Sequence, residues 1–161
     1  MRHGPADGKE GLARNLEMAR AVREAVGQDY ELMFDVFNGW DLIYATEMVR
    51  GLELIGPGWM EEPIPSDRVN ELRKLRTVAR VPIATGEHVY TRWQVKELLL
   101  RDAVDVIQTD PDWTGASRNS RRSVRWRWRS RSRWWPTVIR CSRLFTWPRP
   151  RLRRPSLEWS F

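Results

Sequence analysis

The chain has 161 residues, a formal net charge of +7 at pH 7, ten tryptophans and one cysteine. Its length excludes a complete (β/α)₈ barrel, which needs about 250 residues. The single Cys141 excludes an internal disulfide. The sequence has no apolar run of about 18 residues and no basic-then-apolar leader, so we expect a cytoplasmic protein that does not span a membrane.

The positive charge is concentrated in the C-terminal segment. From Ser117 onward the chain has 14 arginines and a single acidic residue, Glu158, so this segment carries +13 and residues 1–116 carry −6. The segment also contains six tryptophans and lacks Ala, Gly, Asp, Lys and His. We therefore predict a folded domain over residues 1–116 and an Arg/Trp-rich, disordered tail over residues 117–161.

The first elements alternate between helix and strand. Residues 8–26 place apolar side chains at spacings of three and four, which predicts an amphipathic helix that Asp7 caps and Gly27 ends. The short apolar run at residues 31–35 predicts a buried strand. Residues 42–52 repeat the helical spacing, so a helix, a strand and a second helix open the chain.

The same alternation continues to residue 108. Further strands are predicted at residues 58–61, 81–85 and 104–108. Between them, Ser66 is expected to cap a helix over residues 69–78, and Thr91 with Gln94 forms a capping-box pattern before a helix through Arg101. Strict alternation with short links predicts an α/β fold with a parallel sheet, either wound as part of a barrel or open and doubly wound.

Three acidic residues recur at one interval. Asp35, Glu61 and Glu87 are spaced 26 residues apart, and each stands at the C-terminal end of a predicted strand. Equivalent positions on neighbouring parallel strands lie about 4.8 Å apart at one edge of the sheet, so we expect the three carboxylates to converge. Crowded carboxylates repel each other unless a cation lies between them, and hard oxygen ligands favour Mg²⁺. The spacing therefore predicts a magnesium site.

Distinctive motifs surround these acidic residues. They are Phe34–Asp41 (FDVFNGWD), Trp59–Pro63 (WMEEP) and Ile83–His88 (IATGEH). With this spacing they resemble the mandelate racemase and muconate lactonizing family of the enolase superfamily. Two further stretches, Gly4–Gly8 (GPADG) and Gly86–Trp93 (GEHVYTRW), look most like the acid-sugar dehydratases of that family, near the L-rhamnonate dehydratases. The resemblance covers residues 4 to about 115.

The resemblance implies a fold and a reaction. The fold is part of a TIM-type (β/α) barrel with about four βα units, similar to the enolase C-terminal domain. In the reaction, Mg²⁺ binds the carboxylate of a sugar acid, a base removes the neighbouring proton, and a hydroxyl leaves as water. A racemase of the same family is the alternative. Intact relatives are expected to be homo-oligomers that act on small sugar acids, without a specific nucleic-acid or membrane partner.

Several residues match functional positions of that family. Asp35, Glu61 and Glu87 match its three metal ligands. Glu62, the second acid of the WMEEP motif, matches a carboxylate that lies beyond the ligands. His88 is a candidate substrate contact.

The general base is missing from this pattern. Asp110 matches the family's catalytic aspartate, which orients a histidine on the next strand, and Asp112 is an alternative for the same role. Both histidines of the chain, His3 and His88, precede Asp110. The domain that closes the barrel and the first barrel strands also have no counterpart, so we expect a chain that is truncated at both ends and inactive.

The tail admits two explanations. With GC-rich codons, a shift of the reading frame turns Ser117–Ser120 and Arg133–Arg140 into sequence that resembles the family, including its missing histidine, so we hypothesise out-of-frame translation. Interleaved Arg and Trp also suit binding to nucleic acid or to an anionic membrane surface, which is the alternative function. For the domain, an open sheet with a phosphate ligand is the remaining alternative, but no Gly-rich loop follows any predicted strand.

Overall fold

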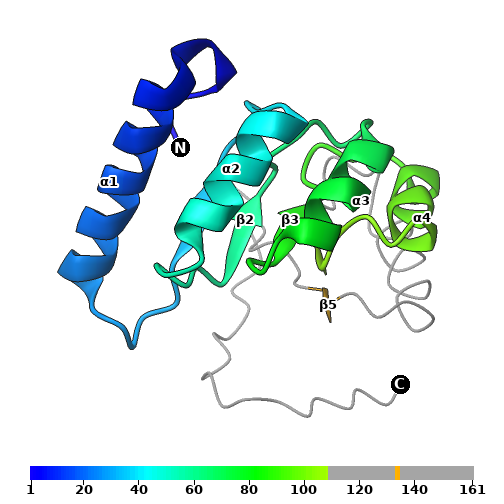
Figure 1. The fold of residues 1–161 in the computed structure, drawn as a ribbon. Coiled ribbons are helices and arrows are strands. Elements are labelled where there is room, and N and C mark those ends of the chain that lie inside the picture. Colours follow the sequence, from blue (N-terminus) through cyan, green and yellow to red (C-terminus); the bar gives the residue numbers. More distant parts are fainter. Residues whose placement is uncertain (109–132, 135–161) are drawn as a thin grey trace, which may run out of the picture.

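A computed structural model describes residues 1–108 and Arg133–Trp134 (Figure 1). Helices and strands alternate along the chain: η1 (Pro5–Asp7), α1 (Gly8–Val26), β1 (Met33–Asp35), α2 (Leu42–Leu52), β2 (Trp59–Glu61), α3 (Val69–Val78), β3 (Ile83–Thr85), α4 (Arg92–Leu100), β4 (Val106–Ile107) and β5 (Arg133–Trp134). The predicted order of elements up to residue 108 is confirmed. The strands are shorter than predicted by one to three residues.

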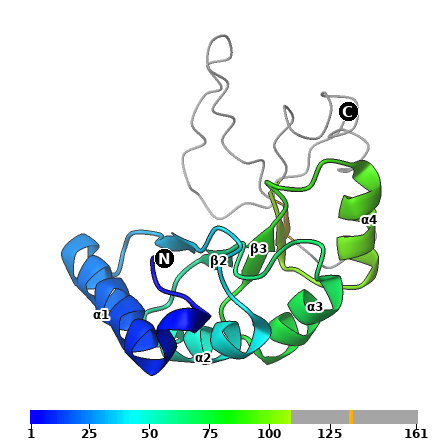
Figure 2. The same ribbon diagram turned by 90° about the horizontal axis from the view of Figure 1, so that it is seen from above.

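All five strands pair in parallel, in the order β1-β2-β3-β4-β5. Figure 2 shows α1 to α4 side by side, in chain order, along one face of this sheet. A doubly wound sheet reverses its strand order and carries helices on both faces, whereas a barrel wall keeps chain order with the helices outside. Over the described residues the structure therefore confirms the partial barrel and rules out the doubly wound alternative.

The apolar core lies between the sheet and the helices. Phe34, Met60 and Ile83 are register partners on β1, β2 and β3, and all three are buried. They belong to one core cluster with apolar residues of α1 to α4. Because side chains alternate across a strand, Asp35 and Glu61 face the opposite side. The sheet thus presents apolar side chains to the helices and acidic ones at its carboxyl-terminal edge.

Two of the predicted helix caps are wrong. Asp7 occupies the N-cap position of α1, but its side chain makes no capping hydrogen bond, and its Oδ2 atom instead accepts from the Gly4 backbone N–H at 2.9 Å. Ser66 does not cap α3, because the turn closed by the Arg68 N–H on the Pro65 carbonyl moves the helix start to residue 69.

Two other predictions about helix ends are confirmed. Thr91 and Gln94 form the predicted capping box at the start of α4. Gly27 ends α1 with a φ of 78°, a conformation that only glycine adopts at little cost. The capping box and the terminal glycine each involve only residues within one turn of the helix end, so the local sequence predicts them.

Two arginines hold the amino-terminal ends of the strands. Arg23 of α1 is 6% exposed, and its guanidinium donates to four backbone carbonyls, those of Gly27, Tyr30, Ile55 and Gly56, at 2.7 to 3.1 Å. These carbonyls lie in the segments that lead into β1 and β2. The planar guanidinium therefore ties two loops together through fixed donor directions.

Arg76 of α3 has a similar role at the next two strands, β3 and β4. It donates to the Asp105 carboxylate at 2.8 Å and forms an ion pair with Asp102 at 2.7 Å. The second carboxylate oxygen of Asp105 accepts from the Ile83 N–H at 2.9 Å, at the start of β3. This chain of contacts joins α3, β3 and the loop before β4.

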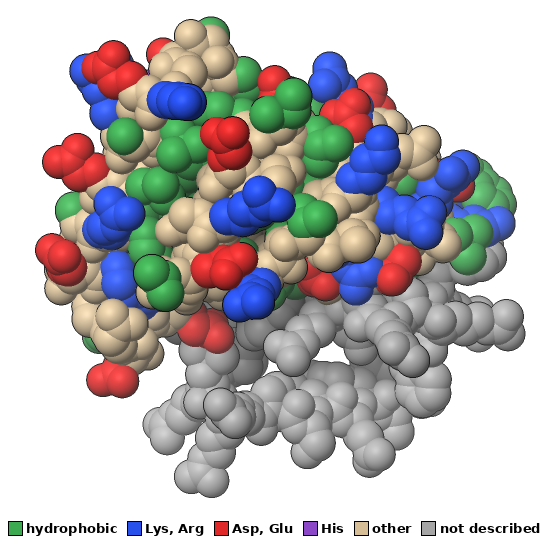
Figure 3. Space-filling view, in the orientation of Figure 1, with side chains coloured by type: hydrophobic (Ala, Val, Ile, Leu, Met, Phe, Trp, Pro, Cys, Tyr) green, Lys and Arg blue, Asp and Glu red, His purple; other side chains and the backbone are tan. Residues whose placement is uncertain are grey.

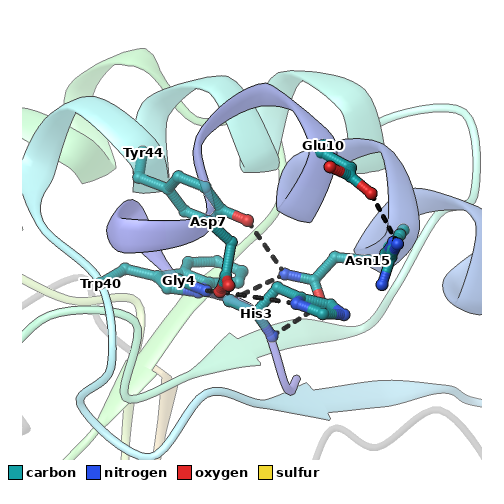
Figure 4. Close-up of polar contacts among 8 residues, drawn as sticks. His3, Gly4, Asp7, Glu10, Asn15, Trp40 and Tyr44 are labelled. Atoms are coloured by element: carbon teal, nitrogen blue, oxygen red, sulfur yellow. Dashed lines mark hydrogen bonds and ion pairs between the residues drawn. The ribbon is translucent and has the colours of Figure 1, made fainter.

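The first residues of the chain are anchored through their backbone (Figure 4). The His3 carbonyl accepts from Trp40 Nε1 at 2.8 Å and from the side-chain amide of Asn15 at 2.9 Å. Asn15 is 1% exposed, and its amide also donates to the Tyr44 hydroxyl at 3.3 Å. The contacts lead the N-terminus to β1, where the Met1 amino group donates to the Asp35 carbonyl.

The outer surface of the helices carries charges of both signs, and Figure 3 shows Lys/Arg and Asp/Glu side chains interspersed over it. Ion pairs such as Arg14–Glu10 and Arg101–Glu97 join consecutive helical turns. This is the usual pattern of a solvated helix face. No helix within residues 1–108 is both long enough and apolar enough to cross a membrane.

Strand β5 lies inside the predicted tail. Its pairing with β4, with Arg133 opposite Val106, differs from the expectation of a tail without regular structure. The physical reason is that strand pairing uses backbone groups, which residues of any type can supply. The other tail residues, and the predicted boundary between residues 116 and 117, lie outside the described residues.

Candidate metal centre

Two of the three predicted ligands lie side by side. Asp35 is the last residue of β1, Glu61 is the last residue of β2, and the two are register partners in the parallel ladder. Both side chains therefore start from the same edge and the same face of the sheet. The interval of 26 residues between them equals one βα unit, which is why the sequence spacing predicts this pair correctly.

The third predicted ligand is displaced from that register. The partner of Glu61 on β3 is Ala84, and Glu87 follows three residues later, beyond the end of the strand. Gly86 makes this turn possible, because its φ is 132° and a Cβ atom there would collide with the Gln108 carbonyl. The three acids are equally spaced in the sequence, but only Asp35 and Glu61 occupy equivalent positions in the sheet.

The charges of the acidic residues nevertheless interact. Partial burial raises the pKa of the Glu87 carboxyl above its usual value, and the negative charges of Glu62, Glu61 and Asp35 raise it further. His88 acts in the opposite direction. A carboxylate whose charge is opposed by three others is a group that a cation would stabilise.

The side chains do not form a closed set of ligands. Asp35 Oδ1 accepts from the Phe37 N–H at 2.8 Å, and Glu61 Oε2 accepts from Trp59 Nε1 at 3.3 Å. In the part of the chain that the structure describes, no three His, Cys, Asp or Glu side chains are grouped so that they could hold a metal ion. The assignment of Asp35, Glu61 and Glu87 as ligands thus stays a prediction.

The donor atoms at this edge suit a hard cation. Besides the carboxylates, the buried oxygens Asn38 Oδ1 and Gln108 Oε1 have no hydrogen-bond partner among the described residues. Both residues follow the ends of strands, Asn38 after β1 and Gln108 after β4. Carboxylate and amide oxygens, with water, are the groups that surround Mg²⁺ in proteins. The chemistry of the edge therefore fits magnesium.

His88, the predicted substrate contact, lies next to Glu87 and is held by a buried acid. His88 Nδ1 is 2.6 Å from Glu62 Oε2, and the His88 N–H donates to Glu62 Oε1 at 3.2 Å. The Phe37 ring packs edge-on against the imidazole at a centroid distance of 5.1 Å. The structure shows how His88 is positioned, and its contact with a substrate stays a prediction.

Sequence reasoning missed Asn38. Its side-chain amide donates to Glu62 Oε2 at 3.0 Å and lies 3.4 Å from His88 Nδ1. Asn38, Phe37 and Glu62 all have positive φ angles, of 60°, 56° and 45°. For a residue other than glycine this conformation costs about 1–2 kcal/mol. The Asn38-Gly39 pair in the sequence could have indicated this conformation, since Asn and Gly both tolerate positive φ angles in turns.

Asp110, the predicted catalytic aspartate, and its alternative Asp112 lie outside the described residues. The last described residue before them is Gln108, whose backbone N–H donates to the Thr85 carbonyl at 3.0 Å. Gln108 thus continues the β3–β4 ladder at the same edge as the acids, and the chain leaves the described region there.

The sequence pattern of the enolase C-terminal domain-like family matches residues 3–128. The chain is 39% identical over 108 residues to an arabinonate dehydratase of Saccharolobus solfataricus, which covers 67% of this chain and 29% of that protein. It is 41% identical over 118 residues to an L-rhamnonate dehydratase of Saccharopolyspora erythraea, which covers 71% of this chain and 30% of that protein.

A solved structure shares the fold. The rhamnonate dehydratase of Gibberella zeae complexed with Mg matches with a TM-score of 0.74 and 30% identity, over 78% of this chain and 31% of that one. The chain thus spans about 30% of the length of the two dehydratases to which its sequence is similar. It belongs to the enolase C-terminal domain-like family, the family that its strand-end motifs resemble.

Proposed function

We propose that residues 1–116 are a metal-binding section of a Mg²⁺-dependent acid-sugar dehydratase barrel, with Asp35, Glu61 and Glu87 as the metal ligands. The observation that carries the proposal is the register pairing of Asp35 with Glu61 at the ends of β1 and β2. The pKa of Glu87, which burial and then the charges of neighbouring carboxylates raise, supports it. The similarity to two sugar-acid dehydratases and to a Mg-bound one supports the reaction and the metal.

Each group has a role in this proposal. Asp35, Glu61 and Glu87 hold the metal, and His88 contacts the sugar acid beside it. When bound, Mg²⁺ supplies a fixed positive charge that attracts a carboxylate and lowers the energy of negative charge that develops next to it. Asp110 orients the base that moves the proton in an intact barrel.

We further propose that this chain by itself does not turn over a sugar acid. The reason is that both histidines precede Asp110, so no histidine is available on the strand that follows it. Racemisation has less support than dehydration, because both sequence relatives are dehydratases. Binding of nucleic acid or membrane by residues 117–161 rests on composition alone, as does a cytoplasmic location.

The proposal is tested by titrating Mg²⁺ into the full 161-residue chain in a calorimeter. Glu61→Gln should weaken binding by roughly 100-fold, because a neutral amide replaces a charged ligand. Glu24→Gln, an exposed change on α1, is the matched control and should leave the affinity unchanged. An unaltered affinity in the Glu61 variant would overturn the ligand assignment.

Activity is measured separately, with arabinonate and L-rhamnonate as substrates. We expect no formation of the dehydrated product by the full chain at saturating Mg²⁺. Product formation that disappears with Glu61→Gln would overturn the proposed inactivity while supporting the metal site.

A further inference from the structure

Glu62 differs from its neighbour Glu61 in burial and in its hydrogen-bond partners. Glu61 is partly exposed and lies at the end of β2, whereas Glu62 is 1% exposed. Glu62 follows the last residue of β2 and has a φ of 45°, so its side chain departs from the alternation of the strand. A buried carboxylate is stable only when its oxygens are satisfied by hydrogen bonds. The partners of Glu62 therefore indicate what it does.

Those partners lie on two different loops. From the loop after β1, Asn38 donates its backbone N–H to the Glu62 carbonyl at 2.7 Å and its side-chain amide to Glu62 Oε2 at 3.0 Å. From the loop after β3, His88 contributes its backbone N–H and its ring Nδ1, at 3.2 and 2.6 Å from the two carboxylate oxygens. Glu62 itself lies in the loop after β2, so one residue connects three consecutive loops.

Each connection is made close to a proposed metal ligand. Asn38 follows Asp35 by three residues, Glu62 follows Glu61 directly, and His88 follows Glu87 directly. The pairing of β1 with β2 already places Asp35 beside Glu61, and the contacts to Glu62 tie the loop that carries Glu87 and His88 to the loops after β1 and β2. The positive φ angles of Asn38 and Glu62 show that these contacts hold the loops in a conformation that the backbone alone does not favour.

We propose that Glu62 is a positioning residue that, through Asn38 and His88, holds the loop of Glu87 in place beside the Asp35–Glu61 pair without itself touching the metal. This inference rests on the proposed metal site. Residues that orient metal ligands without binding the metal commonly change affinity by about 10- to 100-fold when they are altered. Glu62 has the geometry for such an effect, because its two carboxylate oxygens are shared between Asn38 and His88.

The test uses the full chain with Mn²⁺ as the probe, and free Mn²⁺ is followed by electron paramagnetic resonance. Glu62→Ala removes every side-chain contact and should weaken Mn²⁺ binding by about 10- to 100-fold. Glu62→Gln keeps the length of the side chain and one carbonyl oxygen, so it should retain most of the affinity. Glu61→Gln, which neutralises a proposed ligand, is the reference for the loss of a ligand.

A second readout follows the loops without metal. In ¹H–¹⁵N spectra, the amide resonances of Asn38 and His88 should shift in Glu62→Ala and stay near their wild-type positions in Glu62→Gln. The dispersion of the same spectra reports whether each variant folds. If Glu62→Ala does not fold, Asn38→Ala takes its place, since it removes one contact of the three and should weaken Mn²⁺ binding less than Glu61→Gln does.

The outcomes separate the two proposals. Absence of Mn²⁺ binding by the wild-type chain overturns the proposed metal site and the positioning role with it. Wild-type affinity in the folded Glu62→Ala or Asn38→Ala chain, together with a loss in Glu61→Gln, overturns only the positioning role. A loss in Glu62→Gln as large as that in Glu61→Gln also overturns it, because Glu62 would then act as a ligand.

Discussion

The charged side chains at the two ends of the parallel strands have different partners. At the amino-terminal end, Arg23 and Arg76 meet carbonyls and carboxylates that satisfy their donors. At the carboxyl-terminal end, burial and the negative charges of Glu62, Glu61 and Asp35 raise the pKa of Glu87. Charged groups at the amino-terminal end stabilise the fold, because they are paired. At the carboxyl-terminal end the charge of Glu87 destabilises the metal-free fold, and a bound cation would offset this effect.

This difference separates positions where a charge supports folding from positions where it serves binding. Removing a charge at the amino-terminal end should destabilise the chain, and removing the charge of Glu87 at the carboxyl-terminal end should stabilise the metal-free chain. Three substitutions test the contrast by chemical denaturation in urea without metal.

Arg23→Met should have the largest effect. It leaves four backbone carbonyls of the loops before β1 and β2 without their donor, in a site where Arg23 is 6% exposed. Unsatisfied buried groups cost about 1–3 kcal/mol each before relaxation, so we expect the free energy of unfolding to fall by about 3 kcal/mol or more. Arg20→Met, an exposed change three residues earlier on α1, is the control. An equal, small loss in both variants would contradict the role of Arg23.

Arg76→Met should have an intermediate effect. Asp105 would keep its hydrogen bond to the Ile83 N–H and would lose its cationic partner. Because the Arg76 side chain is still 19% exposed, water replaces part of the lost contact, and we expect a loss of about 1–2 kcal/mol. Arg80→Met is the matched control, since the Arg80 side chain is 85% exposed and its ion pair with Glu53 is loose at 3.7 Å.

Glu87→Gln should have the smallest effect and the opposite sign. Burial and the neighbouring carboxylates raise the pKa of Glu87 in the folded chain, so the unfolded chain loses this proton at a lower pH. Stability is therefore lost as the pH rises from the unfolded-state pKa through the folded-state pKa, and the substitution removes this loss. The gain at pH 7 should stay below about 1 kcal/mol, because the side chain is only partly buried and solvent screens its interactions with the neighbouring charges.

The pH dependence checks that prediction. Unfolding curves of the wild type and the Glu87 variant should coincide at a pH below the unfolded-state pKa and separate in favour of the variant above it. Destabilisation by Glu87→Gln at pH 7 in the absence of metal would show that the carboxylate makes a favourable contact in the folded chain. The charge of Glu87 would then stabilise the fold, as the charges at the amino-terminal end do.

The order of the elements and one pair of site residues follow from local sequence. Helix and strand periods determine α1 to α4 and β1 to β4, and Thr91 with Gln94 sets the start of α4. The register pairing of Asp35 with Glu61 follows because one βα unit of constant length separates them. These features depend on residues close in sequence, or on a repeat, so patterns in the sequence predict them.

The tertiary structure alone decided the remaining features. Glu87 leaves the register because Gly86 turns against Gln108, and Glu62 becomes buried because Asn38 and His88 reach it from other loops. Arg23 and Asn15 look like ordinary polar residues of a helix and become central because of carbonyls on distant segments. The sequence by itself determined which residues form helices and strands and where acids follow the strands. Which of those acids share a site depends on contacts between segments that no local pattern specifies, because their geometry exists only once the strands are paired.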